Sequence, residues 1–206
     1  MIDADSYLAL DRVFTGNMTG NVLFIGFALV GVAGIPFFNN VIALLGFVTG
    51  SIVGGRIVGG GHAKGLPTVS AVLLLSGGLL GLAIATIWTV VGHLDQPLLL
   101  VLTFLLAAVM GSQVSAVKPI GNSDVTTIVV TNTLANLARD SKLAGGIGER
   151  WASRLLAILA MGAGAAVGAF VIRLSDGSIA LYCAMILYAA GLATLVLTSR
   201  SAHATP

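Results

Sequence analysis

The sequence predicts an all-α polytopic membrane protein, and three observations carry this prediction. Of the 206 residues, 57% are apolar and only 9% are charged, whereas a soluble domain carries roughly 25% charged residues. The mean hydropathy is +1.02. Apolar runs near the ~20 residues needed to cross a bilayer occupy most of the chain. Little length remains for a soluble catalytic domain, so we expect one membrane domain over residues 1–206.

Prolines and short polar clusters divide the chain into long apolar stretches. Six of these stretches have about the length of a transmembrane helix, and they cover residues 13–33, 41–58, 69–91, 98–117, 151–171 and 179–197. A seventh stretch, residues 125–138, is short and is interrupted by Thr127, Thr131, Asn132, Thr133 and Asn136. Its composition favours a broken or re-entrant helix over a complete crossing.

Basic residues indicate the orientation, because they concentrate on the cytoplasmic side of membrane proteins. We let the chain start in the cytoplasm, cross six times, and return to its starting side through residues 125–138. Nine of the ten basic residues, Arg12 among them, then lie at the cytoplasmic face, and only Arg173 lies outside. We therefore predict that both termini are cytoplasmic. The first residues do not have the pattern of a cleaved secretory signal.

Small residues recur every four positions in two of the predicted spans, 114 residues apart: Gly46, Gly50 and Gly54, and then Ala160, Gly164 and Gly168. Polar motifs at 15–21 and 131–137 recur at a separation of 116 residues. Three crossings separate the two glycine-rich spans, so the copies would face opposite ways. This order predicts an inverted repeat with halves of about 1–92 and 97–206. The small-residue stripes also suit plain helix packing, within one chain or in a homodimer.

Hydroxyl and amide side chains gather beside glycines in residues 11–21 (DRVFTGNMTGN), at the start of a predicted helix. Such side chains cap free backbone N–H groups and bond neighbouring helices. They also surround the positive end of a helix dipole, where a polar or anionic solute is attracted. A structural role and a solute-binding role both follow from these residues.

Several short segments resemble one known family. They are residues 3–4 (DA), 6–10 (SYLAL), 13–21 (VFTGNMTGN), 110–113 (MGSQ), 116–118 (AVK), 124–127 (DVTT) and 131–138 (TNTLANLA). Together they are similar to the YoaK-like family of uncharacterised bacterial inner-membrane proteins, over nearly the whole chain. The resemblance implies a multi-pass protein of the bacterial inner membrane and supplies no biochemical activity.

The chain departs from the family pattern in two places. Family members usually carry an apolar helix ahead of the position that matches Asp3, and small or apolar residues where Asp5 and Asp11 stand. We expect either a start inside a longer gene or the loss of one element of the first repeat. The family also has glycine at the position of Asn132 and threonine at that of Ala135, so the second motif is expected to be partly degraded.

Our leading hypothesis is a small secondary transporter or permease for a polar or anionic solute, with the two repeats rocking around a central site. Its predicted substrate-binding residues are Thr15, Asn17, Thr19, Asn21, Gln113, Asp124, Thr127, Thr131, Asn132 and Asn136. For Asp124, a helix N-cap and a carboxylate for a coupling cation both fit. The alternative hypothesis is a non-transporting structural or stress-related membrane protein that acts through helix–helix partners.

Enzymatic, metal-dependent and nucleic-acid-binding classes receive no support from the sequence. The three histidines lie far apart, and Cys183 is the only cysteine, so no multi-cysteine metal site can form. No catalytic triad order or phosphate-binding loop is recognisable, and the basic residues form no patch. We predict no cofactor. The expected partners are the lipid bilayer, a small solute or ion, and a second copy of the chain.

Overall fold

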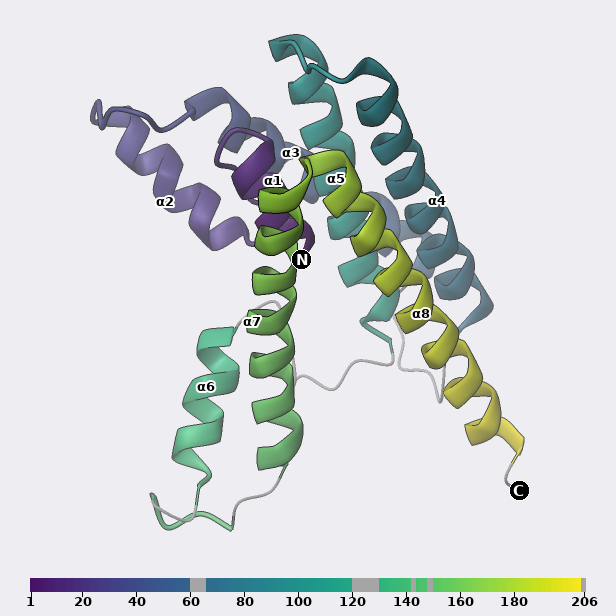
Figure 1. The fold of residues 1–206 in the computed structure, drawn as a ribbon. Helices are drawn as coiled ribbons and strands as arrows, with labels where there is room; N and C mark the ends of the chain where they lie inside the picture. The colour runs from purple at the N-terminus through teal and green to yellow at the C-terminus, as the bar shows by residue number, and fades with distance from the viewer. Residues whose placement is uncertain (60–65, 120–129, 142–143, 148–149, 205–206) are drawn as a thin grey trace.

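The computed structural model describes residues 1–59, 66–119, 130–141, 144–147 and 150–204. Within these ranges the chain forms helices and no strand (Figure 1). The helices are α1 (Ile2–Ala9), α2 (Met18–Leu29), α3 (Phe37–Val58), α4 (Thr68–Val91), α5 (Gln96–Val117), α6 (Val130–Arg139), α7 (Trp151–Leu174) and α8 (Gly177–Ala204).

Five of these helices, α3, α4, α5, α7 and α8, are long and apolar enough to cross a membrane. Helices α3, α4, α5 and α7 match four of the last five predicted spans to within four residues at either end, and α8 matches the fifth but runs seven residues beyond its predicted end. Much of their surface is exposed. In α7, only 6% of the apolar stretch is buried inside the protein. The predicted class, an all-α polytopic membrane protein, is confirmed.

The long helices alternate in direction. Gly177 at the start of α8 lies against Trp88 near the end of α4, while Tyr188 further along α8 bonds the carbonyl of Leu74 near the start of α4. We call the end of the bundle that holds residues 30–36, 92–95 and 175–176 the Gly34 face. The opposite end, which holds residues 56–59, 117–119 and 139–151, is the Arg56 face. The core between them includes Ile84, Leu102 and Leu181.

Helices α3 and α5 make the most extensive contact in the fold. Gly46 lies against the backbone of Phe104, Gly50 against that of Ala108, and Gly111 of α5 against that of Phe47. A side chain at these positions would collide with a backbone carbonyl, so glycine permits the approach. Where two membrane helices come this close, van der Waals packing replaces the hydrophobic effect as the attraction. The Ser51 hydroxyl donates a hydrogen bond to the carbonyl of Gly111, and the Ser115 hydroxyl donates one to the carbonyl of Ser51.

The first predicted span, residues 13–33, is wrong as a single crossing. Asn17 caps a helix that starts at Met18, and the chain leaves that helix at Gly31, which has a positive φ of 82°. The 12 residues of α2 extend only ~18 Å, short of the ~30 Å hydrocarbon core. Arg12 Nη1 donates a hydrogen bond to the carbonyl of Gly34 at 3.1 Å, so the two ends of the predicted span lie at the same face.

This contact also corrects the predicted position of Arg12. The neighbouring Asp11 accepts a hydrogen bond from Asn39 at the start of α3, and Asn39 accepts one from Gln96 at the start of α5. Arg12 therefore lies at the Gly34 face with Arg173, instead of with Arg56. The sequence-based prediction placed Arg12 on the opposite side because it treated residues 13–33, which follow Arg12, as a complete crossing.

The seventh predicted stretch, residues 125–138, lies only partly within the described residues. Its described part belongs to α6, a 10-residue helix that packs against α7. Figure 1 shows α6 beside the first half of α7, with its last turn at the Arg56 face.

The glycine contact between α3 and α5 yields a prediction. Gly50→Ala places a methyl group against the carbonyl oxygen of Ala108, and it should lower the free energy of unfolding by about 1–3 kcal/mol. Gly162→Ala on α7 is the matched control, because no atom from outside its own stretch of helix lies within 4 Å of the added methyl group. This control should be neutral or stabilising by up to ~1 kcal/mol.

Thermal unfolding in a mild detergent measures both changes. A Gly50→Ala protein as stable as the Gly162→Ala protein would contradict the close α3–α5 packing.

Candidate functional site

The turn between α1 and α2 is held by Asp3. Its Oδ1 accepts hydrogen bonds from the backbone N–H of Thr15 at 3.0 Å and from that of Gly16 at 2.6 Å, and it lies 3.5 Å from the Thr15 hydroxyl. Thr15 is completely buried. One carboxylate oxygen thus satisfies two backbone donors just before α2 begins. The turn needs such support because Asp11 and Arg12 both adopt positive φ, which is uncommon for residues other than glycine.

The two asparagines of the TGNMTGN motif act on the backbone of the same turn. Asn17 Oδ1 accepts from the N–H of Gly20 at 3.5 Å and caps α2. The buried Asn21 side chain binds both backbone groups of Phe14, accepting from its N–H at 3.0 Å and donating to its carbonyl at 2.6 Å. The Phe14 ring in turn stacks on Tyr7 of α1 at a centroid distance of 4.9 Å.

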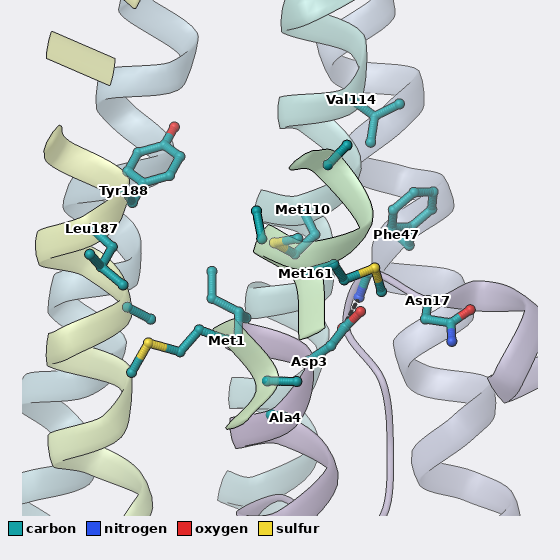
Figure 2. Close-up of a pocket in the computed structure, with 16 residues that line it drawn as sticks. Met1, Asp3, Ala4, Asn17, Phe47, Met110, Val114, Met161, Leu187 and Tyr188 are labelled. Atoms are coloured by element: carbon teal, nitrogen blue, oxygen red, sulfur yellow. Dashed lines mark hydrogen bonds between the residues drawn. The ribbon is translucent and has the colours of Figure 1, made fainter. Parts of the chain in front are cut away.

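A cavity of about 450 Å³ lies beside the start of α2. It is lined by Asp3, Gly16 and Asn17 and by residues from the middle of α7 and α8. Figure 2 shows Met161 of α7 and Leu187 of α8 among them. Phe47, Met110 and Tyr188 complete the wall. The cavity is therefore at mid-depth in the bundle and mainly apolar, with Asp3 and Asn17 at the α1–α2 turn and Tyr188 on α8 as its polar side chains.

A second cavity, of about 310 Å³, lies between α5 and α8 and shares Met110, Val114 and Tyr188 with the first. Gln113 lines it, and its Nε2 is buried without a hydrogen-bond partner among the described residues. The Tyr188 hydroxyl donates to the carbonyl of Leu74 at 2.7 Å. The shared wall places the two cavities next to each other between α5 and α8.

The structure brings only part of the predicted site together. Asn17 lines the first cavity and Gln113 lines the second, whereas Thr15 and Asn21 are buried in the turn and Thr19 is exposed. On α6, Thr131 and Asn132 are exposed, and the backbone carbonyl of Asn136 accepts a bond from Arg154. Asp124 and Thr127 lie outside the described residues. The α6 motif thus lies on α7 and does not line either cavity.

Sequence reasoning missed Asp3 and Tyr188. Asp3 stands 12 residues before Thr15, and a helix followed by a tight turn was needed to bring the two together. An acidic residue ahead of an apolar stretch was the available signal, because an ionisable group at membrane depth is a functional hypothesis by default. In the described part of the chain, no group of three histidine, cysteine or acidic residues could hold a metal ion.

A buried arginine attaches α6 to α7 at the Arg56 face. Arg154 Nη1 donates to the carbonyl of Asn136 at 3.0 Å and to Asp140 at 2.9 Å. Asp140 also accepts a bond from Arg139 at 2.9 Å. Hydrogen bonds from Arg139, and then from Arg154, lower the pKa of the Asp140 carboxyl.

Comparison with known proteins places the chain in a family. The sequence pattern of a family described as a protein of unknown function, DUF1275, matches residues 1–194. The chain belongs to the DUF1275 family. It is also 30% identical over 140 residues to the UPF0700 transmembrane protein YoaK of Bacillus subtilis (strain 168). The predicted YoaK-like family is thereby confirmed, and the relative's description as a transmembrane protein agrees with the five long apolar helices.

The match to the Bacillus protein covers 68% of this DUF1275 chain and 61% of the relative. The chain therefore spans less than two thirds of the relative's length. No solved structure matches the chain.

The two bonds between Asn21 and Phe14 yield a prediction. Asn21→Ala leaves the buried N–H and carbonyl of Phe14 without these partners, and it should lower the free energy of unfolding by about 1–3 kcal/mol. Thr19→Ala, on the exposed side of the same helix turn, should change it by less than about 0.5 kcal/mol. Thermal unfolding of both variants in detergent checks the difference. Equal stabilities would mean that the Asn21 side chain does not hold the turn.

The Asp140 contacts yield a pH prediction. A carboxyl with a lowered folded-state pKa stabilises above its unfolded pKa of about 3.9 and loses this effect as the pH falls through the folded-state pKa. The distance between α6 and α7 should therefore stay constant from about pH 7 to 5 and increase only below about pH 4.

Spin labels at the exposed positions Leu134 and Leu156, in a chain carrying Cys183→Ala, measure this distance. Asp140→Asn should broaden the distance distribution at every pH, and Asp95→Asn should not. A transition between pH 5 and 8 would contradict this account.

Proposed function

We propose that this DUF1275 protein is a permease for a small solute, and that the cavity beside α2 is its binding site. The observation that carries the proposal is a helix that begins at mid-depth, next to a cavity lined by Asp3, Gly16 and Asn17. Irregular backbone at this depth is tolerated where protein covers it or where it lines a cavity. Discontinuous helices of this kind form the substrate sites of many secondary transporters.

The energetics of buried polar groups support a solute site over a purely stabilising role. Hydrogen bonds between membrane helices contribute only ~0.6 kcal/mol on average, while a charged group inside the bilayer is costly. Asp3 therefore gives the turn a modest gain at a considerable desolvation cost. A solute that uses the carboxylate during transport accounts for its position on the cavity wall.

We further propose that residues 1–92 and 97–206 form two inverted repeats. The pairing of helices supports this: α3 packs on α5 and α7 packs on α1, while the short helices α2 and α6 lie on α3 and α7 respectively. The pairs α4–α5 and α8–α1 correspond in the same way, and α4 and α8 pack on each other. The short helix α2 of the first half would then correspond to α6 of the second, each directed toward one face, which suits rocking between two open states.

We propose the inner membrane as the location, with the Arg56 face in the cytoplasm. Five basic residues support this orientation: Arg56, Lys118, Arg139, Arg150 and Arg154 stand at or near the helix ends of that face. The Gly34 face holds Arg12 and Arg173. The C-terminal end of α8 points to the Arg56 face, and α1 runs from mid-depth toward the Gly34 face.

A second function is favoured by a different observation. Most of α7 is exposed, and no atom from outside its own stretch of helix lies within 4 Å of the position that a side chain at Gly162 would take. A non-transporting protein that binds a second copy or another membrane helix through α7 fits this surface. The internally bonded Asn21 and Thr15 would then serve only to shape the fold.

Filling the cavity separates the two functions. Ala160→Phe adds a ring at a position that lines the cavity, and Ala163→Phe adds the same ring at an exposed position of α7 that does not line it. In protein reconstituted into vesicles, a solute panel should show uptake above that of protein-free vesicles. Ala160→Phe should reduce this uptake at least about tenfold, since steric exclusion of the solute removes its binding energy.

Ala163→Phe should leave uptake unchanged and should weaken self-association if α7 is a homodimer interface. Uptake that is reduced only by Ala163→Phe, or no uptake for any solute, would contradict the permease proposal.

A further inference from the structure

Asp5 of α1 is a buried carboxyl group that the proposed solute site does not use. Only 1% of its surface is exposed, and neither carboxyl oxygen has a hydrogen-bond partner among the described residues. It faces α7, because a side-chain carbon added at Gly168 would lie 2.7 Å from Asp5 Oδ1. Gly168 stands ~9 Å before α7 ends at Leu174. Asp5 therefore lies within the depth of the membrane.

This environment suits a neutral carboxylic acid. An ionised carboxylate that is removed from water without hydrogen bonds is far more costly than its protonated form. A metal cation beside Asp5 would need several oxygen ligands, and no group of three histidine, cysteine or acidic residues occurs in the described part of the chain. A proton needs only the carboxyl group. Asp5 can thus hold a proton while α1 is packed on α7.

The titratable groups around Asp5 do not replace the missing water. Helix α1 packs on α7 and α8, and no titratable side chain described on these helices bonds Asp5. Those on α1 are Asp3 and Tyr7, and those on α7 and α8 are Arg154, Arg173, Tyr182, Cys183 and Tyr188. The charged group whose field reaches Asp5 is the Met1 amino group, which favours the ionised form. Where the Met1 nitrogen is an amide, this opposing charge is absent, so the preference for a proton does not depend on it.

Asp5 is close to the first cavity, although it does not line it. Met1 and Ala4 line the cavity, and their side-chain carbons lie 3.2 and 3.4 Å from a carbon added at Gly168. A separation of α1 from α7 would therefore open Asp5 to the cavity. Helix α1 also carries Asp3, whose bonds to the turn hold the start of α2. The same movement would thus displace the cavity wall.

From this geometry we infer that Asp5 is the proton-binding site that couples the permease to a proton gradient. This inference rests on the permease proposal above and adds its coupling ion. With the proton on Asp5, α1 packs against Gly168. On release, the O–H bond of the acid breaks and the proton passes to a water molecule in the cavity. The remaining carboxylate favours the arrangement in which α1 has left α7 and the carboxylate is hydrated. Because the family pattern has a small or apolar residue at this position, the site is inferred for this chain alone.

Infrared difference spectroscopy tests the bound proton. At pH 6 an exposed aspartate is about 99% ionised, given its ordinary pKa of about 3.9. The C=O stretching band of a protonated carboxyl group should nevertheless be present in the wild-type protein and absent from Asp5→Asn. Asp95→Asn removes an exposed carboxyl group and should leave this band unchanged. A free Met1 amino group opposes the proton, so a band found at this pH is found against its effect. Spectra without a band that depends on Asp5 would overturn the proton site.

Solute uptake tests the coupling. In vesicles whose membrane potential is held at zero, a difference of about one pH unit can drive accumulation of up to about tenfold when one proton accompanies each solute molecule. The wild-type protein and Asp95→Asn should accumulate a solute of the panel in one direction of the gradient, beyond the level of protein-free vesicles. Asp5→Asn cannot release a proton and should let the solute enter only down its own concentration gradient. Asp5→Ala provides a second variant for the same comparison.

The outcomes separate the two proposals. Wild-type uptake that ignores the pH gradient, or accumulation that survives in Asp5→Asn or Asp5→Ala, overturns the coupling and leaves the permease proposal standing. If no solute enters the vesicles, the permease proposal fails and the coupling fails with it. The infrared band decides in either case whether Asp5 holds a proton.

Discussion

The fold depends on how the backbone of residues 10–17 finds hydrogen-bond partners inside a membrane. Water is absent from the hydrocarbon core, so a chain that leaves the helical conformation there must satisfy its N–H and carbonyl groups with other protein groups. Asp3 and Asn21 do this for Thr15, Gly16 and Phe14. Because of these bonds α2 can start at mid-depth, and its position creates one side of the central cavity.

The close approach of α3 and α5 supplies the rigid part of the molecule. Their glycines bring the two backbones together over several turns, and the starts of both helices are joined to Asp11 through Asn39 and Gln96. The turn is thereby connected to the tightest pair of helices. In contrast, α7 touches its neighbours over little of its surface, and α6 is attached to it through Arg154. The tight α3–α5 pair joins the two proposed halves, so any movement is expected where the packing is loose, at α6 and α7.

Hydropathy alone predicted the fold class and the last five spans, because the length of an apolar run reflects bilayer thickness. It failed at the first span because residues 13–33 have the length of a crossing and are mostly apolar, and composition cannot distinguish one crossing from a turn followed by a short helix. The decisive interactions, Asp3 with Gly16 and Arg12 with Gly34, join residues 13 and 22 positions apart. The motif at 15–21 was predicted to be important, but which of its side chains bond the backbone and which face a cavity follows from three-dimensional positions.

Asp3 unites the structural and the solute-binding interpretations of this motif. A purely structural role would be served by a neutral amide, which also accepts hydrogen bonds and is less costly to bury than a carboxylate. A pure binding residue would have no reason to bond two backbone N–H groups. Asp3 bonds the N–H groups of Thr15 and Gly16 through one oxygen, and it also lines the cavity. A ligand that draws on this carboxylate would also alter the bonds that hold the start of α2, so occupancy of the cavity and the position of the short helix are physically coupled.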